Sequence, residues 1–234
     1  MTAVSVPDRG SSRIPLAYVV ALVPVAAALN VVGGTINTAL GLPTFLDMIG
    51  TAVVAILLGP WWGALVGVIS NTAGAFVTGP VNVPFALVNV AGALVWGYGV
   101  RSFGMGASAS RFFVLNVIVA VVTSAVAAPI VVLVFGGATG HSSDVLTAAF
   151  AQAGQDLLAA AFTSSVIVSL ADKIITGFVA LAIIDALPAE LSRGLRLPGP
   201  TPNGRLAIAI GGVVIGAALV AVYVFLTPPA PPAA

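Results

Sequence analysis

The sequence has little of what metal binding and side-chain catalysis use. It contains no cysteine and a single histidine, His141, among 234 residues. Disulfide bonds and thiolate metal sites are therefore excluded, and we expect no metal and no cofactor. Neither a G-x-x-x-x-G-K-[ST] nucleotide loop nor an H-E-x-x-H motif occurs, and one histidine gives no plausible Ser-His-Asp set. A membrane enzyme is thus the class favoured least, and energy from ATP would have to come through another chain.

Charge is also scarce, and this decides the class of protein. Charged residues make up 6% of the chain, hydrophobic residues 59%, and the mean hydropathy is +1.16. A water-soluble domain needs far more polar surface than this composition can supply. We therefore expect an all-α integral membrane protein that crosses the plasma membrane several times. Its expected surroundings are the lipid bilayer, and we expect no binding to nucleic acid.

Apolar runs long enough to cross a bilayer, about 17 to 25 residues, predict seven membrane helices. Their ranges are 14–32, 45–58, 60–78, 84–100, 111–135, 171–187 and 206–226. Gly59-Pro60 separates the second from the third, because proline ends a helix but can open the next one. These two helices should form a tight hairpin, with Trp61 and Trp62 at the boundary between membrane and water.

The segment 142–170 is long enough to span but carries Gln152, Gln155, Asp156 and a run of Ser and Thr. If it is instead an outer segment, helical or re-entrant, every arginine falls on one side of the membrane. These arginines are Arg9, Arg13, Arg101, Arg111, Arg193, Arg196 and Arg205. The positive-inside rule assigns that side to the cytoplasm, so the N-terminus is predicted to be cytoplasmic.

The predicted organisation has five parts. They are a cytoplasmic N-terminal segment (1–13), a six-helix substrate-binding membrane domain (14–190), a cytoplasmic linker (191–205), an additional transmembrane helix (206–226) and a disordered tail (227–234). The basic start and apolar run also fit a signal peptide, but the run is too long and lacks a clear cleavage site. The first helix is therefore expected to be retained, and the last to serve packing or assembly.

Polar side chains converge on the outer half of the predicted bundle. The candidate substrate-binding residues are Asn37, Asp47, Asn71, Asn82, Asn89, Trp96, Gln152, Asp156 and Lys173. Ionisable groups in or near a membrane are costly, which favours a functional role for the aspartates. Other interpretations stay open: asparagines can simply join helices, Asp172-Lys173 can be a self-compensating pair, and Asp47 can cap the helix that follows it.

Three stretches carry a resemblance to a known family: LDMIGTAVVAILLGPWWGALVGVISN, GPVNVPFALVNVAGALVWGYG and ADKIITGFVALAIIDALP. They resemble the substrate-binding S component of energy-coupling factor (ECF) transporters, which import vitamins and other small molecules in prokaryotes. The resemblance covers about residues 14–190, and the helix at 206–226 departs from the six-helix pattern.

The resemblance implies a substrate pocket under the outer loops, with residues 33–44 as a lid. It implies a transmembrane T component and two ATPase subunits as partners, with Ala17 and Ala21 in an Ala-x-x-x-Ala pattern against the T component. Lys173 would bind an anionic group of the substrate, and Asp47 or Asp156 a cationic one. The expected substrate is a small water-soluble micronutrient, such as a vitamin or its precursor.

Other classes remain possible on the sequence alone. A membrane ligand-sensing module would use the same pocket but needs a separate signalling partner. A secondary transporter would need coupled ion sites and usually shows inverted repeats, and no convincing repeat is present. A purely structural assembly protein would not require polar residues to gather in one half of the bundle.

Overall fold

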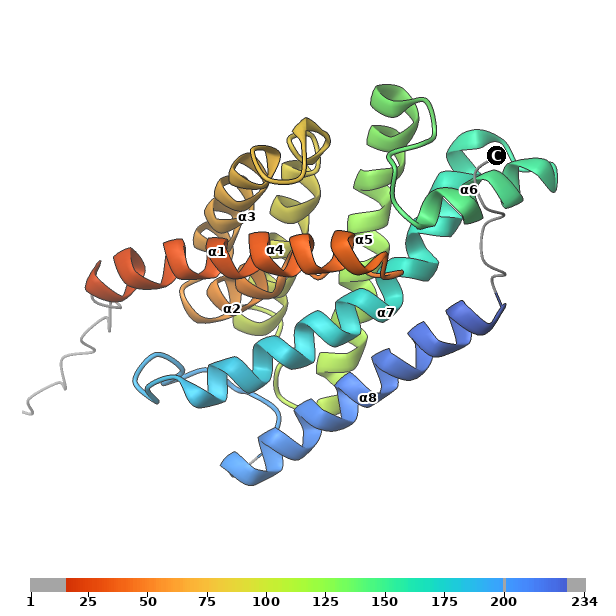
Figure 1. Cartoon of the computed structure of the whole chain (residues 1–234). Helices are drawn as coiled ribbons and strands as arrows, with labels where there is room; N and C mark the ends of the chain where they lie inside the picture. The colour runs from red at the N-terminus through yellow and green to blue at the C-terminus, as the bar shows by residue number, and fades with distance from the viewer. Residues whose placement is uncertain (1–15, 200, 227–234) are drawn as a thin grey trace, which may run out of the picture.

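The computed structural model describes residues 16–199 and 201–226, and all secondary structure in these residues is helical (Figure 1). The predicted N-terminal segment 1–13 and tail 227–234 lie outside the described residues. The elements in chain order are α1 (Leu16–Leu40), α2 (Ile49–Leu57), α3 (Pro60–Ala75), η1 (Pro80–Asn82), α4 (Ala86–Arg101), α5 (Ala109–Phe135), α6 (Ser143–Gln152), α7 (Leu157–Ala186) and α8 (Pro202–Leu226). The predicted all-α class is confirmed for this part of the chain.

Four of these helices, α1, α5, α7 and α8, are long and apolar enough to cross a membrane. The chain is therefore a membrane-embedded helical protein. The helices at the predicted second, third and fourth spans are shorter, with nine residues in α2 and 16 each in α3 and α4. At 1.5 Å per residue α2 extends only about 14 Å, less than half of a bilayer core of about 30 Å. The predicted span at 45–58 is thus a short internal helix.

The predicted hairpin at Gly59-Pro60 is confirmed. α2 ends at Leu57 and α3 begins at Pro60, the position at which proline opens a helix without losing a hydrogen bond. Gly59 has a φ of 119°, a conformation that side chains other than that of glycine rarely adopt. Trp61 and Trp62 are exposed at the start of α3, and their place at the boundary between membrane and water stays a prediction.

The predicted lid at 33–44 is wrong, because α1 continues to Leu40 and only residues 41–48 form an irregular loop. Thr35 and Thr38 donate hydroxyl hydrogen bonds to carbonyls four residues earlier, which is compatible with a continuing helix. At Gly33 the missing side chain leaves room for the carbonyl of Leu46. The loop therefore lies against the side of α1 instead of extending from its end.

The predicted outer segment 142–170 is divided between two helices. Its first part forms α6, but the helix expected at 171–187 already begins at Leu157. The serines that suggested a surface segment, Ser164, Ser165 and Ser169, are buried inside the bundle. Both α6 and the start of α7 lie at one end of the bundle in Figure 1, away from the starts of α5 and α8.

α2 occupies the centre of the molecule. Every residue from 50 to 57 is buried, and the helix packs against α1, α3, α4 and α7. α5 packs along α7, and α8 lies along the other side of α7, as Figure 1 shows. At the crossing of α1 and α2, a side chain on Gly50 would collide with the backbone carbonyl of Ala26. Glycine at this position sets the close approach of the two helices.

We predict that Gly50→Ala destabilises the protein, by about 1 to 3 kcal/mol, because the added methyl group overlaps backbone that cannot move aside. The matched control is Gly211→Ala in α8, where a side chain would meet nothing within 4 Å. That change should leave stability equal or slightly higher, since alanine favours helix. Thermal unfolding in mild detergent compares the two variants. Equal melting temperatures would contradict the close approach of α1 and α2 at Gly50.

Candidate functional site

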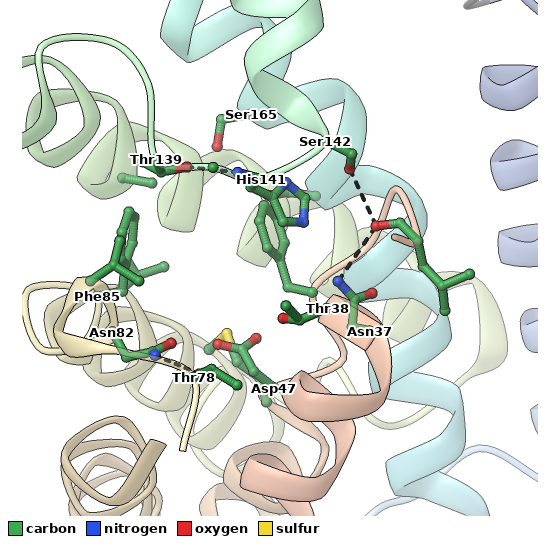
Figure 2. Close-up of a pocket in the computed structure, with 18 of the residues that line it drawn as sticks. Asn37, Thr38, Asp47, Thr78, Asn82, Phe85, Thr139, His141, Ser142 and Ser165 are labelled. Atoms are coloured by element: carbon green, nitrogen blue, oxygen red, sulfur yellow. Dashed lines mark hydrogen bonds between the residues drawn. The ribbon is translucent and has the colours of Figure 1, made fainter. Parts of the chain in front are cut away.

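A cavity of about 290 Å³ lies among the ends of several helices (Figure 2). Its walls come from the end of α1, the loop 41–48, η1 with the residues around it, α5, α7 and the loop that precedes α6. A second cavity of about 110 Å³ adjoins it, and the two share Asn37, Asp47 and Asn82 among their lining residues. The linker that carries Arg193 and Arg196 follows the end of α7 and lies at the other end of that helix from α6 (Figure 1).

Five of the predicted site residues are brought together here. Asn37, Asp47, Asn82 and Lys173 line the larger cavity, and Asn71 lines the smaller one. Figure 2 shows Asp47 directed into the cavity, with Asn82 nearby. The residue that caps α2 is Met48, and no side chain forms a cap hydrogen bond there. Asp47 thus belongs to the cavity, and the alternative interpretation as a helix cap is not supported.

Two predicted site residues join helices instead of lining a cavity. The indole Nε1 of Trp96 donates to Oδ1 of Asn116 at 2.8 Å, which connects α4 to α5. Asn89 accepts a hydrogen bond from the hydroxyl of Thr51 at 2.8 Å and donates to Oδ2 of Asp47 at 3.4 Å. Asn89 therefore acts on the site indirectly, through the carboxylate of Asp47.

The other two, Gln152 and Asp156, are exposed beyond the cavity. Asp156 accepts a hydrogen bond from the backbone N–H of Ala159 at 3.0 Å and so caps the start of α7. A carboxylate at this position satisfies amides that have no partner inside the helix. Of the two aspartates proposed for a cationic group, only Asp47 lies in the cavity.

A buried carboxylate holds the loop 41–48 in place. Oδ1 of Asp172 accepts the backbone N–H groups of Phe45 at 2.9 Å and Leu46 at 2.8 Å, and Oδ2 accepts from Nζ of Lys173. Leu46 has a φ of 54°, a left-handed conformation that costs an L-residue about 1–2 kcal/mol. The pair Asp172–Lys173 is therefore self-compensating, as one interpretation predicted, but it lies inside the protein and stabilises a strained turn.

His141 is a site residue that the sequence did not reveal. Its Nε2 lies 2.8 Å from the carbonyl of Thr44, and its Nδ1 lies 3.1 Å from the backbone N of Ser143. A carbonyl can only accept, so Nε2 donates to Thr44, and Nδ1 also lies 3.0 Å from the hydroxyl of Ser143. The ring stacks on Phe45 with 4.5 Å between centroids. The available signal was a lone histidine in a polar turn between apolar helices.

A chain of hydrogen bonds leads from α3 to the cavity. Asn30 donates to the hydroxyls of Ser70 at 3.2 Å and Thr51 at 2.8 Å, and Thr51 donates in turn to Asn89. Asn89 then contacts Asp47. These buried polar groups satisfy one another and position the carboxylate that faces the cavity. Asparagine thus joins helices here and also supports the site.

Two carboxyl groups and one ammonium group lie at or beside the cavity. Asp47 and Lys173 line it, and Asp172 is bound to Lys173. Among the described residues, no group of three or more His, Cys, Asp or Glu side chains could hold a metal ion. No family model, no curated protein and no solved structure matches this chain.

We predict that Asp172→Asn destabilises the protein by about 3 to 5 kcal/mol, because it leaves Lys173 buried without its counter-charge. The control is Asp185→Asn, which breaks the more exposed ion pair with Arg205 and should cost less than about 1 kcal/mol. Melting temperatures in detergent compare the two.

The double variant Asp172→Asn/Lys173→Met separates the ion pair from the loop contacts. It should regain part of the stability lost in Asp172→Asn, since no unpaired charge remains. Equal effects of Asp172→Asn and Asp185→Asn would contradict a buried clamp.

Proposed function

We propose that this chain is the substrate-binding subunit of an ECF-type importer. It captures a small water-soluble micronutrient from outside the cell and delivers it through a T component, while two partner ATPase subunits hydrolyse ATP. The observation that carries this proposal is a cavity with several polar side chains in its walls, inside an otherwise apolar helical bundle. The resemblance described above supplies the type of transporter.

The walls of the cavity support ligand binding over a structural role. Protein interiors are normally packed without voids of this size, and a bundle that served only assembly would fill the space. Instead the hydroxyls of Thr38, Thr78, Ser165 and Ser169 line it, together with the amide of Asn82. Neutral polar groups around a cavity near the low end of small-molecule sites suit a compact, water-soluble ligand.

Two loops cover the cavity and form the proposed gate. His141 contacts the carbonyl of Thr44, and the hydroxyl of Ser142 donates to the carbonyl of Leu42 at 3.2 Å. Both contacts join the loop 41–48 to the loop before α6. Their release would uncover the site without any change in the long helices. The gate is therefore the loop 41–48, in place of the predicted 33–44.

The orientation follows from the arginines. The linkers that bear them meet at one end of the bundle, where Gly106 abuts the carbonyl of Arg196, and the cavity lies at the other end. We place the arginine end and the N-terminus in the cytoplasm and the cavity toward the outside. Ala17 and Ala21 are exposed on α1, where the proposed T component can contact them.

We predict that the wild-type chain, gently purified, carries a small metabolite that native mass spectrometry detects. Ala127→Phe should abolish it, because Ala127 lines the cavity and a phenyl ring would occupy it. Ala125→Phe on the same helix is the control, since Ala125 is exposed, and it should retain the metabolite. A wild type that carries only lipid, unchanged in both variants, would contradict ligand capture. A bound metabolite together with a kinase partner would favour the sensing module.

The orientation gives a second prediction, and the absence of native cysteine makes it straightforward to test. In intact cells a membrane-impermeant maleimide should label Gln152→Cys, at the exposed end of α6. It should label Ser102→Cys, in the exposed loop after α4, only after the cells are permeabilised. The reverse pattern would place the cavity toward the cytoplasm and contradict uptake.

A further inference from the structure

We propose that the cavity selects a small organic cation with a flat ring, held through Asp47 with its ring between Phe85 and His141. This inference rests on the proposed function insofar as the bound molecule is the imported substrate. It replaces the expectation that Lys173 binds an anionic group. Three features of the site carry it: the pairing of its charges, the hydrogen-bonding capacity of its amide, and the position of its aromatic rings.

The first feature is that only one of the two carboxyl groups at the cavity forms an ion pair. Asp172 already receives two backbone N–H groups and the ammonium of Lys173. The side chain of Asp47 receives the neutral amide of Asn89 at 3.4 Å and forms no ion pair among the described residues. A ligand with one positive charge would supply the counter-charge that this carboxyl group lacks. The carboxylate would repel an anionic ligand.

An anionic ligand would have to take Lys173 away from its partner. Lys173 is 2% exposed and is bound to Asp172, which lies beside it on α7. Separating them leaves Asp172 buried without a counter-charge, and the anion would then lie near Asp47 as well. The lysine therefore serves the loop clamp, and its presence in the lining does not make the site an anion site.

The second feature is that Asn82 offers an acceptor. Its Nδ2 already donates to the hydroxyl of Thr78 at 2.8 Å and to the carbonyl of Gly79 at 2.9 Å. The group left for a ligand is its carbonyl Oδ1. Figure 2 shows Asn82 and Asp47 on the same side of the cavity. Two acceptors in the lining of one cavity suit the N–H groups of an amine or amidinium.

The third feature is a pair of aromatic walls. Both ring nitrogens of His141 are occupied by the backbone, so the ring presents a face to its surroundings, and it is stacked on Phe45. Phe85 stacks on Phe135 with 5.9 Å between centroids and lies on the other side of the cavity in Figure 2. Aromatic faces attract flat rings and cations alike. The geometry therefore fits a ring that carries the charge or holds it next to Asp47.

The test uses three probes of nearly equal shape with the full chain in nanodiscs: benzamidinium, benzamide and benzoate. Isothermal titration calorimetry should show benzamidinium binding at least tenfold more tightly than benzamide, with benzoate the weakest. In Asp47→Asn the preference should disappear, because the affinity for benzamidinium should fall at least tenfold while the affinity for benzamide stays unchanged. Asp156→Asn, a carboxylate outside the cavity, is the control and should keep the wild-type order.

Three results on the wild type would overturn the inference: benzoate as the tightest of the probes, equal affinity for all three, or no binding of benzamidinium. So would a preference for benzamidinium that survives in Asp47→Asn. Retained benzamide binding shows that the Asp47→Asn variant folds. If the variant does not fold, the order of the three affinities on the wild type tests the inference by itself.

The proposed importer function and the proposed preference for a cation can be contradicted separately. A co-purified metabolite without a positive charge would overturn the preference and leave the importer in place. A cation preference in a chain that never associates with a T component would support the preference and count against the importer.

Discussion

The structure depends on one constraint: α2 is buried inside an apolar bundle, so the polar backbone groups at its ends and in the half-buried loop before it need partners from the protein. Asp172 accepts the amides of Phe45 and Leu46, and Asn30 accepts the amide of Gly50 at 2.7 Å. At the other end of α2, Arg101 donates to the carbonyls of Ile56 and Leu57. Side chains from α1, α4 and α7 thus converge on one short segment, and those helices are arranged to deliver them.

The candidate site follows from the same constraint. α1 ends at Leu40 and α2 begins at Ile49, so the chain between them is irregular, and the cavity lies against it. Of the residues that hold this loop, His141 lines the cavity, and Asp172 is bound to Lys173, which also lines it. The hydrogen bonds that support the loop therefore also shape the candidate site, and this explains why polar residues gather in one half of the bundle.

Features that depend on composition or local sequence were predictable. The membrane class came from hydropathy, the hairpin from Gly59-Pro60, and several cavity residues from the convergence of polar side chains. The extension of α1 was not predictable, because the stretch GGTINT is typical of a loop unless the loop 41–48 packs against its glycines. The roles of His141 and Asp172 rest on partners 97 and 126 residues away. No local pattern contains that information.

The separation of Asp172 from the loop that it holds also has a consequence for biosynthesis. The ribosome completes α1 to α4 well before it reaches α7, so the first half of the chain enters the membrane with the amides of Phe45 and Leu46 still waiting for their carboxylate. The left-handed turn at Leu46 gains its support only when α7 arrives. The candidate site is therefore among the last parts of the molecule to form, because its loop and its α7 wall come together only once the C-terminal half has been inserted.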